Sequence, residues 1–204
     1  MSNWITAVFL GDSLTAGFQQ GPGYLPPRYY PFTNMLESSL RIKLREIGTN
    51  KDIVVVNQGI DGDSTGGMLE RFNRSVAPEN PHIVLIWGGI NDLSTRSTPE
   101  DVLPNIIELI KRTKATEAIP IVLNVTAVDG VHFNETIQKL IDLTKDFCTK
   151  NEIAYLDVFS ELVDEKGKLA LEYSNDGAHL SDRGYQKLIP IIFKAIMFHI
   201  EEEL

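Results

Sequence analysis

Five short runs of apolar, mostly β-branched residues alternate along the chain with longer segments of helical periodicity. The runs are almost continuously apolar, which is typical of parallel strands covered on both faces rather than of strands with one face in water. Strands that alternate with helices imply right-handed crossovers and a parallel sheet between two helical layers. We therefore expect an α/β protein, a three-layer α/β/α sandwich, with strands at residues 5–10, 53–57, 83–87, 121–125 and 154–158.

The size of the chain matches one ordinary globular domain. Its 204 residues, 43% of them apolar and 23% charged, are enough to bury one well-formed core, so we expect residues 1–204 to form a single domain. The last apolar stripe, between Tyr185 and Ile200, predicts a helix that completes this domain. Ser181 is placed to cap the start of that helix.

The charge and the two ends of the chain restrict its partners and its location. A formal net charge of −9 is opposite to that of nucleic-acid-binding proteins, so no nucleic acid is expected as a partner. No apolar run approaches the roughly 20 residues of a membrane span, and the first residues lack the basic region of a signal peptide. The single cysteine, Cys148, lies in an apolar helical pattern and is expected to be buried. The sequence predicts a cytoplasmic protein without stable membrane insertion.

A serine follows the first strand almost directly. Gly11 permits an abrupt turn, and Ser13 then lies where the strand gives way to a helix. A hydroxyl at this place is presented at the carboxyl end of the sheet, beside a helix N-terminus that favours developing negative charge. Serine is also a preferred N-cap residue. This segment alone therefore leaves two interpretations of Ser13, a nucleophile or a helix cap.

Later strand exits contain the partners that a nucleophilic serine requires. His179 can take the serine proton, and Asp176, three residues earlier, can orient the imidazole, although this aspartate can instead bond local backbone. The backbone N–H groups of Ser13 and Gly62 and the side-chain amide of Asn91 can donate to the oxyanion of a tetrahedral intermediate. Taken singly, Gly62 and Asn91 are equally well explained as turn residues.

Residues 18–30 are rich in proline and aromatic residues and predict a long loop near the serine, either a pocket wall or a packed surface loop. Phe18 and Tyr24 in this loop are candidate substrate contacts. His132, in the loop after the fourth strand, is a further candidate contact. No paired metal-ligand spacing indicates a metal site. Three other polar residues are expected to hydrogen-bond the strand-exit loops and not to take part in chemistry: Asp12, Asn57 and Asp92.

Four short blocks that lie at or near strand exits form a recognisable set. They are Gly11-Asp12-Ser13-Leu14, Gly62, Gly89-Ile90-Asn91-Asp92 and Asp176-Gly177-Ala178-His179. In their order and strand context they resemble the four blocks of the SGNH hydrolase superfamily, also called GDSL lipases or esterases. The residue two after the serine is Thr15 and not glycine, which disfavours the G-x-S-x-G elbow of the α/β-hydrolases.

The resemblance implies a flavodoxin-like five-stranded parallel sheet of order 2-1-3-4-5. It implies that Ser13 is the nucleophile, that His179 is the base and that Asp176 orients the histidine. It also implies an oxyanion hole formed by Ser13, Gly62 and Asn91. No metal and no cofactor are implied.

The expected function is hydrolysis of a small-molecule carboxylic ester through an acyl-enzyme. A thioesterase, a lysophospholipase or a carbohydrate acetylesterase would use the same residues, and the aromatic residues of the 18–30 segment favour an acyl or aryl group over a bare sugar. The alternative from another class is a flavodoxin-like domain that binds a phosphate or a flavin without catalysis. That alternative leaves His179 and Asp176 without a role.

Overall fold

The computed structural model describes residues 3–21 and 25–202, which are built around a five-stranded parallel sheet. The sheet has the order β4-β1-β5-β6-β7, and each neighbouring pair is parallel. Counted in chain order within this sheet, the order is 2-1-3-4-5, as the family resemblance implied. The strands are β1 (Trp4–Gly11), β4 (Asp52–Gly59), β5 (Ile83–Trp87), β6 (Ile119–Leu123) and β7 (Ala154–Leu156).

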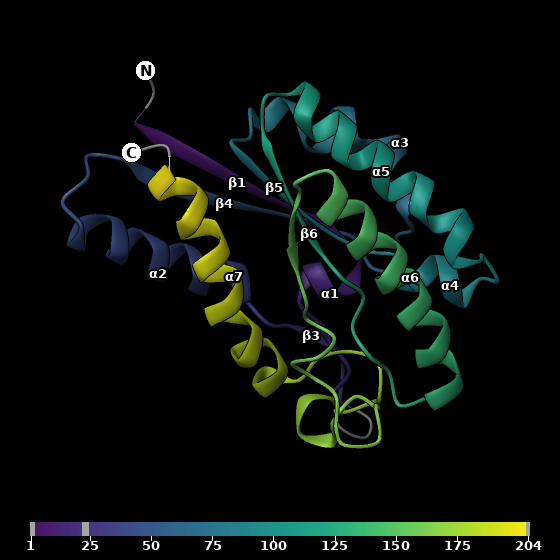
Figure 1. Ribbon diagram of the computed structural model, residues 1–204. Helices are drawn as coiled ribbons and strands as arrows, with labels where there is room; N and C mark the ends of the chain where they lie inside the picture. The colour runs from purple at the N-terminus through teal and green to yellow at the C-terminus, as the bar shows by residue number, and fades with distance from the viewer. Residues whose placement is uncertain (1–2, 22–24, 203–204) are drawn as a thin grey trace.

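A helical layer covers each face of the sheet, as Figure 1 shows. Helices α2 and α7 lie on one face, and α3, α5 and α6 lie on the other. Consecutive side chains of a strand point to opposite faces, so β1 contributes Phe9 to the first core and Val8 and Leu10 to the second. The expected α/β/α sandwich is confirmed. The helices are α2 (Phe32–Glu46), α3 (Thr65–Ser75), α5 (Pro99–Ala115), α6 (Val131–Lys150) and α7 (Asp182–Glu202).

Strand β6 begins and ends two residues earlier than the sequence pattern predicts, at Ile119–Leu123. The backbone N–H of the next residue, Asn124, still donates to the carbonyl of Leu156 at the end of β7 (3.1 Å). The side-chain oxygen of Asn124 accepts hydrogen bonds from the backbone N–H groups of Val158 (2.8 Å) and Phe159 (2.9 Å). Strand β7 ends at Leu156, two residues earlier than predicted, and the N–H groups of Val158 and Phe159 are bonded to this side chain and not to a neighbouring strand.

The long loop expected at residues 18–30 contains a feature that the sequence did not indicate. The structure has a short antiparallel pair there, in which β2 (Phe18–Gln19) is bonded to β3 (Arg28–Tyr29). The rings of Phe18 and Tyr29 contact each other across this pair, with centroids 5.9 Å apart. Next to this pair, the backbone N–H of Tyr30, which follows β3, donates to the carbonyl of Gly17, which precedes β2 (2.7 Å). Tyr24 lies outside the described residues.

The burial of the single cysteine agrees with the sequence. Cys148 is fully buried, and burial raises the pKa of its thiol to about 11. Within the described part of the chain, no helix is long and apolar enough to cross a membrane. The remaining short elements are α1 (Ser13–Ala16), η1 (Ala77–Glu79), α4 (Ile90–Ser94) and η2 (Leu171–Tyr173).

Candidate active site

Ser13 is the first residue of the short helix α1, directly after strand β1. The residue that caps this helix is Asp12, whose Oδ1 accepts a hydrogen bond from the N–H of Leu14 (2.9 Å). The cap is therefore supplied by the aspartate, and the alternative interpretation of Ser13 as the helix cap is wrong. Ser13 is 8% exposed and lies at the carboxyl end of the sheet, where α/β proteins place their ligands.

His179 and Asp176 form a hydrogen-bonded pair, with 2.8 Å between Nδ1 of the histidine and Oδ2 of the aspartate. The other carboxylate oxygen of Asp176 accepts from the N–H groups of Ala178 (3.0 Å) and His179 (2.8 Å). The sequence left open whether this aspartate binds the histidine or local backbone, and the structure shows that it does both. Partial burial alone raises the pKa of Asp176, but the hydrogen bonds from His179 and from the two backbone amides outweigh it and lower the pKa. The carboxylate is ionised.

Contacts just after Ser13 hold the histidine segment against the serine turn. The ring of Phe18 lies against the ring of His179, with 4.5 Å between centroids. The side chain of Gln19, 1% exposed, donates from Nε2 to the carbonyl of Leu180 (3.0 Å). The strand that follows the Ser13 turn is thus bonded directly to the residues around the candidate base.

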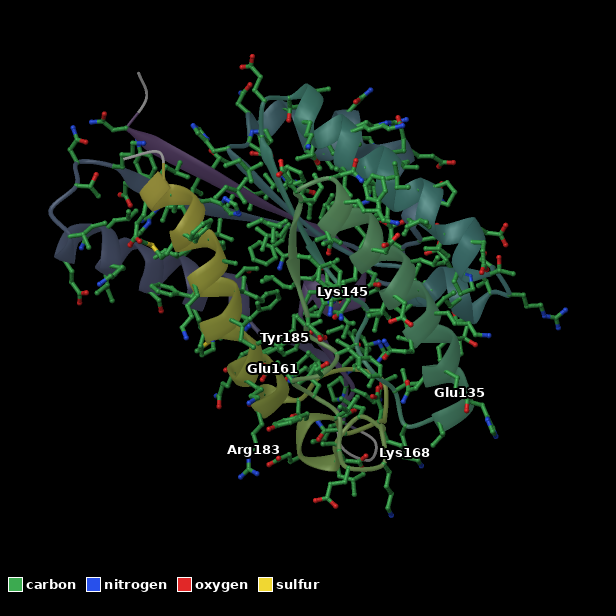
Figure 2. The ribbon with its side chains drawn as sticks, viewed as in Figure 1. Glu135, Lys145, Glu161, Lys168, Arg183 and Tyr185 are labelled. Carbon is green, nitrogen blue, oxygen red and sulfur yellow. The ribbon has the colours of Figure 1, made fainter. Side chains whose placement is uncertain are left out.

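A buried tyrosine makes a second link between the two segments. Tyr185, near the start of α7, donates its hydroxyl proton to the carbonyl of Leu14 (2.8 Å). Its ring stacks on Phe32, with 5.0 Å between centroids, and is 1% exposed. Figure 2 shows Tyr185 at the lower end of α7, on the side that faces the rest of the molecule. Helix α7 therefore carries a fixed contact with the residue next to Ser13.

The loop after β6 supports the same turn from the other side. The N–H of Asp129 donates to the carbonyl of Gly177 (2.7 Å), between the candidate aspartate and histidine. The carboxylate of Asp129 is bonded in turn to Lys168 (2.8 Å), which Figure 2 labels at the lower end of the molecule. The Asp176–His179 turn is consequently held by β2 and the loop after β6.

The two candidate oxyanion residues come from different loops that the structure joins. Gly62 follows β4 and has a φ of +75°, a conformation that favours glycine. Asn91 lies in α4 after β5, and its Nδ2 donates to the carbonyl of Asp63 (2.9 Å), the residue next to Gly62. A side-chain amide has two N–H groups, so this bond orients Asn91 and leaves its second N–H available to a ligand.

The polar residues assigned to the strand-exit loops have that role. Both oxygens of Asp92 accept from Thr65, at 2.6 Å from its hydroxyl and 2.9 Å from its N–H. The side chain of Asn57 donates to the carbonyl of Thr15 (2.8 Å), two residues after Ser13. These bonds connect the loops after β1, β4 and β5.

The structure places His132 at the start of α6 with its side chain 98% exposed and its ring 3.7 Å from the carboxylate of Glu135. Glu135 projects outward in Figure 2, away from the labelled Tyr185. A contact between His132 and substrate stays a prediction. In residues 3–21 and 25–202, no group of three or more histidine, cysteine or acidic side chains is arranged to hold a metal ion.

The sequence reasoning missed Arg71, which is 2% exposed and lies on α3. Its side chain is bonded to the ends of β1 and β4. Its signal is the presence of a charged residue on an apolar helix face, three residues after the buried Met68 and next to the buried Phe72. A buried arginine is rare unless it is paired, so this pattern alone was a reason to expect a structural or functional partner.

Comparisons with known proteins identify the family of this chain. The model of the GDSL-like lipase/acylhydrolase family matches residues 9–187. An arylesterase from Vibrio mimicus is 24% identical over 191 residues, which cover 94% of this chain and 88% of that protein. The crystal structure of a lipase/acylhydrolase from Enterococcus faecalis is similar with a TM-score of 0.74 and 25% identity, covering 94% of this chain and 95% of that one.

An acetylxylan esterase from Geobacillus stearothermophilus shares the fold, with a TM-score of 0.73 and 18% identity over 94% of each chain. The chain therefore belongs to the GDSL-like lipase/acylhydrolase family of the SGNH hydrolase superfamily, and it is a serine ester hydrolase.

Proposed function

We propose that the protein hydrolyses carboxylic esters by transferring the acyl group first to Ser13 and then to water. The observation that carries this proposal is the 2.8 Å hydrogen bond between His179 Nδ1 and Asp176 Oδ2. Because an ionised carboxylate only accepts, this bond keeps the ring proton on Nδ1. Nε2 is then the basic nitrogen of His179, as a general base for a serine requires.

In the first half-reaction, Nε2 of His179 takes the hydroxyl proton while Oγ of Ser13 forms a bond to the ester carbonyl carbon. The carbonyl oxygen becomes an oxyanion and accepts hydrogen bonds from the N–H groups of Ser13 and Gly62 and from Nδ2 of Asn91. The intermediate collapses when the bond to the alcohol oxygen breaks. The proton held by His179 passes to the leaving alcohol.

In the second half-reaction, a water molecule takes the place of the alcohol. His179 removes its proton, the water oxygen attacks the acyl carbon, and a second oxyanion forms at the same donors. Collapse breaks the bond to Ser13 Oγ, which regains its proton from His179, and the carboxylic acid is released. Throughout, the ionised Asp176 stabilises the positive charge that the imidazole carries between the two proton transfers.

A cleft of about 520 Å³ beside the nucleophile helix offers space for one part of the ester. It is bordered by Ala16 of α1 and by the loop that leads to Gly62. Tyr29 and Ile60, which are 57% and 49% exposed, give it an apolar surface that suits an aryl or alkyl group. The relative named an arylesterase supports the aromatic part of this substrate class.

The charge of the protein favours a neutral ester over an acyl-CoA thioester as the substrate. The protein has a formal net charge of −9, and the cleft contains the carboxylate of Asp61. A polyanionic coenzyme is repelled by this surface, whereas a neutral ester is not. We therefore propose that the enzyme hydrolyses uncharged esters faster than acyl-CoA thioesters. Acetylated sugars are the third class of substrate to be compared.

The test combines labelling with a substrate panel. A fluorophosphonate probe is expected to form an adduct at Ser13 in the folded protein and none in Ser13→Ala, while Ser38→Ala, a change at an exposed helical serine, labels normally. p-Nitrophenyl esters from acetate to palmitate are assayed beside acyl-CoA and acetylated xylo-oligosaccharides. Absence of an adduct at Ser13 overturns the mechanism, and faster turnover of acyl-CoA than of any neutral ester overturns the substrate class.

A further inference from the structure

Arg71 contacts three different segments with one buried side chain, which is 3% exposed. Its Nε donates to Asp63 Oδ2 at 2.7 Å. Its Nη2 donates to the carbonyl of Gly11 at 3.0 Å and to that of Gln58 at 2.8 Å. The guanidinium group is a planar fork with fixed donor directions, so these bonds fix the end of β1, the end of β4 and the loop before α3 relative to one another.

The contact with Gly11 bears on the nucleophile. Gly11 is the last residue of β1, two positions before Ser13. Its carbonyl also accepts from the N–H of Ile60 (3.0 Å), so two donors converge on one oxygen at the start of the nucleophile turn. Any shift of this carbonyl moves the backbone that carries Ser13.

The contact with Asp63 bears on the oxyanion donors. Asp63 directly follows Gly62, and its carbonyl accepts the hydrogen bond that orients the amide of Asn91 (2.9 Å). Its carboxylate lies so close to α3 that a Cβ added at Gly67 would be 2.1 Å from Oδ1. The ion pair with Arg71 therefore holds a residue that is covalently joined to one donor and hydrogen-bonded to the other.

We propose that Arg71 is a positioning residue that sets the distance between the Ser13 nucleophile and the oxyanion donors Gly62 and Asn91. The inference rests on the function proposed above. Arg71 reaches no reacting atom in this arrangement, and it acts only through the two loops that it joins. A misplacement of about 1 Å in an active site lowers the rate on the order of 10²-fold. Loss of the contacts by which Arg71 fixes the two loops should therefore lower kcat.

The competing explanation is a purely structural one, in which Arg71 only neutralises the buried carboxylate of Asp63. Both explanations predict a less stable variant. They differ in the kinetics that they predict for the folded variant. If Arg71 positions the oxyanion donors, its loss should lower kcat more than it changes KM, because these donors stabilise the transition state more than the bound substrate.

The variants are Arg71→Met and Arg71→Lys, with Arg112→Met as the matched control. Arg112 lies on α5 and donates from Nη1 to the carbonyl of Leu69 on α3 (2.8 Å), so it also anchors α3 but contacts none of the strand exits. Kinetics are measured with a p-nitrophenyl ester under conditions where circular dichroism shows each protein to be folded.

For Arg71→Met we expect kcat to fall about 10- to 100-fold, with KM changed less than about threefold and the pH profile of kcat/KM unchanged. For Arg71→Lys we expect a smaller fall in kcat. The ammonium group keeps the positive charge beside Asp63, although it reaches fewer acceptors than the guanidinium group. Arg112→Met is expected to stay within about twofold of the unaltered enzyme. Equal losses in Arg71→Met and Arg112→Met overturn the proposal.

A double-mutant cycle with Asn91→Ala gives the decisive comparison. Asn91→Ala alone is expected to lower kcat on the order of 10²- to 10³-fold. If Arg71 acts through the oxyanion hole, its replacement lowers kcat by a much smaller factor in the Asn91→Ala background than in the unaltered enzyme. Additive losses overturn the positioning role while the proposed function stands, whereas full activity of Ser13→Ala overturns the proposed function itself. Should Arg71→Met fail to fold, Arg71→Lys carries the cycle.

Discussion

Replacing Asp12 by asparagine tests how the turn that carries Ser13 is stabilised. Asp12 is 1% exposed, and its Oδ1 accepts from the N–H of Leu14 (2.9 Å). Its Oδ2 is buried and has no hydrogen-bond partner among the described residues. Burial, assisted by the negative charges of Asp63 and Asp92, raises the pKa of this carboxyl from 3.8 to about 7.

The direction of the pH effect follows from the raised pKa of Asp12. Between about pH 4 and pH 7 the folded protein holds this proton and the unfolded chain does not, so stability falls as the pH rises through that window. At about 1.4 kcal/mol for each pH unit, the whole effect is about 4 kcal/mol. From about pH 5 to pH 8 it is about 2.5 kcal/mol, because part of the loss has already occurred below pH 5.

Asp12→Asn keeps the oxygen that accepts from Leu14 and cannot ionise. The amide has two N–H groups at the unpartnered position where the protonated carboxyl has one O–H, so the variant has one additional unpaired donor, which costs about 1–3 kcal/mol at every pH. The stability of the variant relative to the unaltered protein should therefore rise by about 2.5 kcal/mol from pH 5 to pH 8. The variant is expected to be the more stable protein at pH 8.

The assay is urea unfolding of both proteins at several pH values, followed by the fluorescence of the buried Trp87. Other titrating groups are present in both proteins and cancel in the difference. Asp146→Asn, at a surface carboxylate paired with Lys150, is the control and should show no such trend. A stability difference between Asp12→Asn and the unaltered protein that stays constant from pH 5 to pH 8 would refute the reasoning.

Three further predictions follow from single contacts. Asp176→Asn should lower kcat on the order of 10²- to 10⁴-fold, because the histidine loses the partner that fixes its proton; unchanged turnover would contradict that role. Tyr185→Phe keeps the core ring but leaves the carbonyl of Leu14 without its donor, so urea unfolding should show a loss of about 1–2 kcal/mol. Cys148 should react with a thiol reagent only after denaturant unfolds the chain, because its thiol is buried and its pKa is raised; fast labelling of the folded protein would contradict this.

The architecture was largely predictable from the sequence, because the signals that specify it are local. Continuous apolar runs mark strands buried on both faces, and apolar residues at helical spacing mark the covering layers. Ser13, Asp176 and His179 were also identifiable, since each stands beside a strand exit or a helix start and has side-chain chemistry suited to acyl transfer. Because the carboxyl ends of parallel strands lie at one edge of a sheet, their positions predicted that they come together there.

The details of the site depended on contacts between residues far apart in the chain. Asp12, and not Ser13, caps α1, and its altered pKa arises from burial under neighbouring loops that no local pattern encodes. Residues 18–30 pair as short strands because Phe18 and Tyr29 meet across the turn.

The sequence by itself determined that five strands alternate with helices and which chemical groups follow the strands. The tertiary structure decided how those groups are held, and Arg71 is the clearest example. On one helix its apolar neighbours Met68 and Phe72 show only that it faces the interior. Its three acceptors come from the ends of two strands and from the loop before the helix. A buried charge takes its partners from whatever the fold brings within hydrogen-bond distance, and that proximity exists only once the chain is folded.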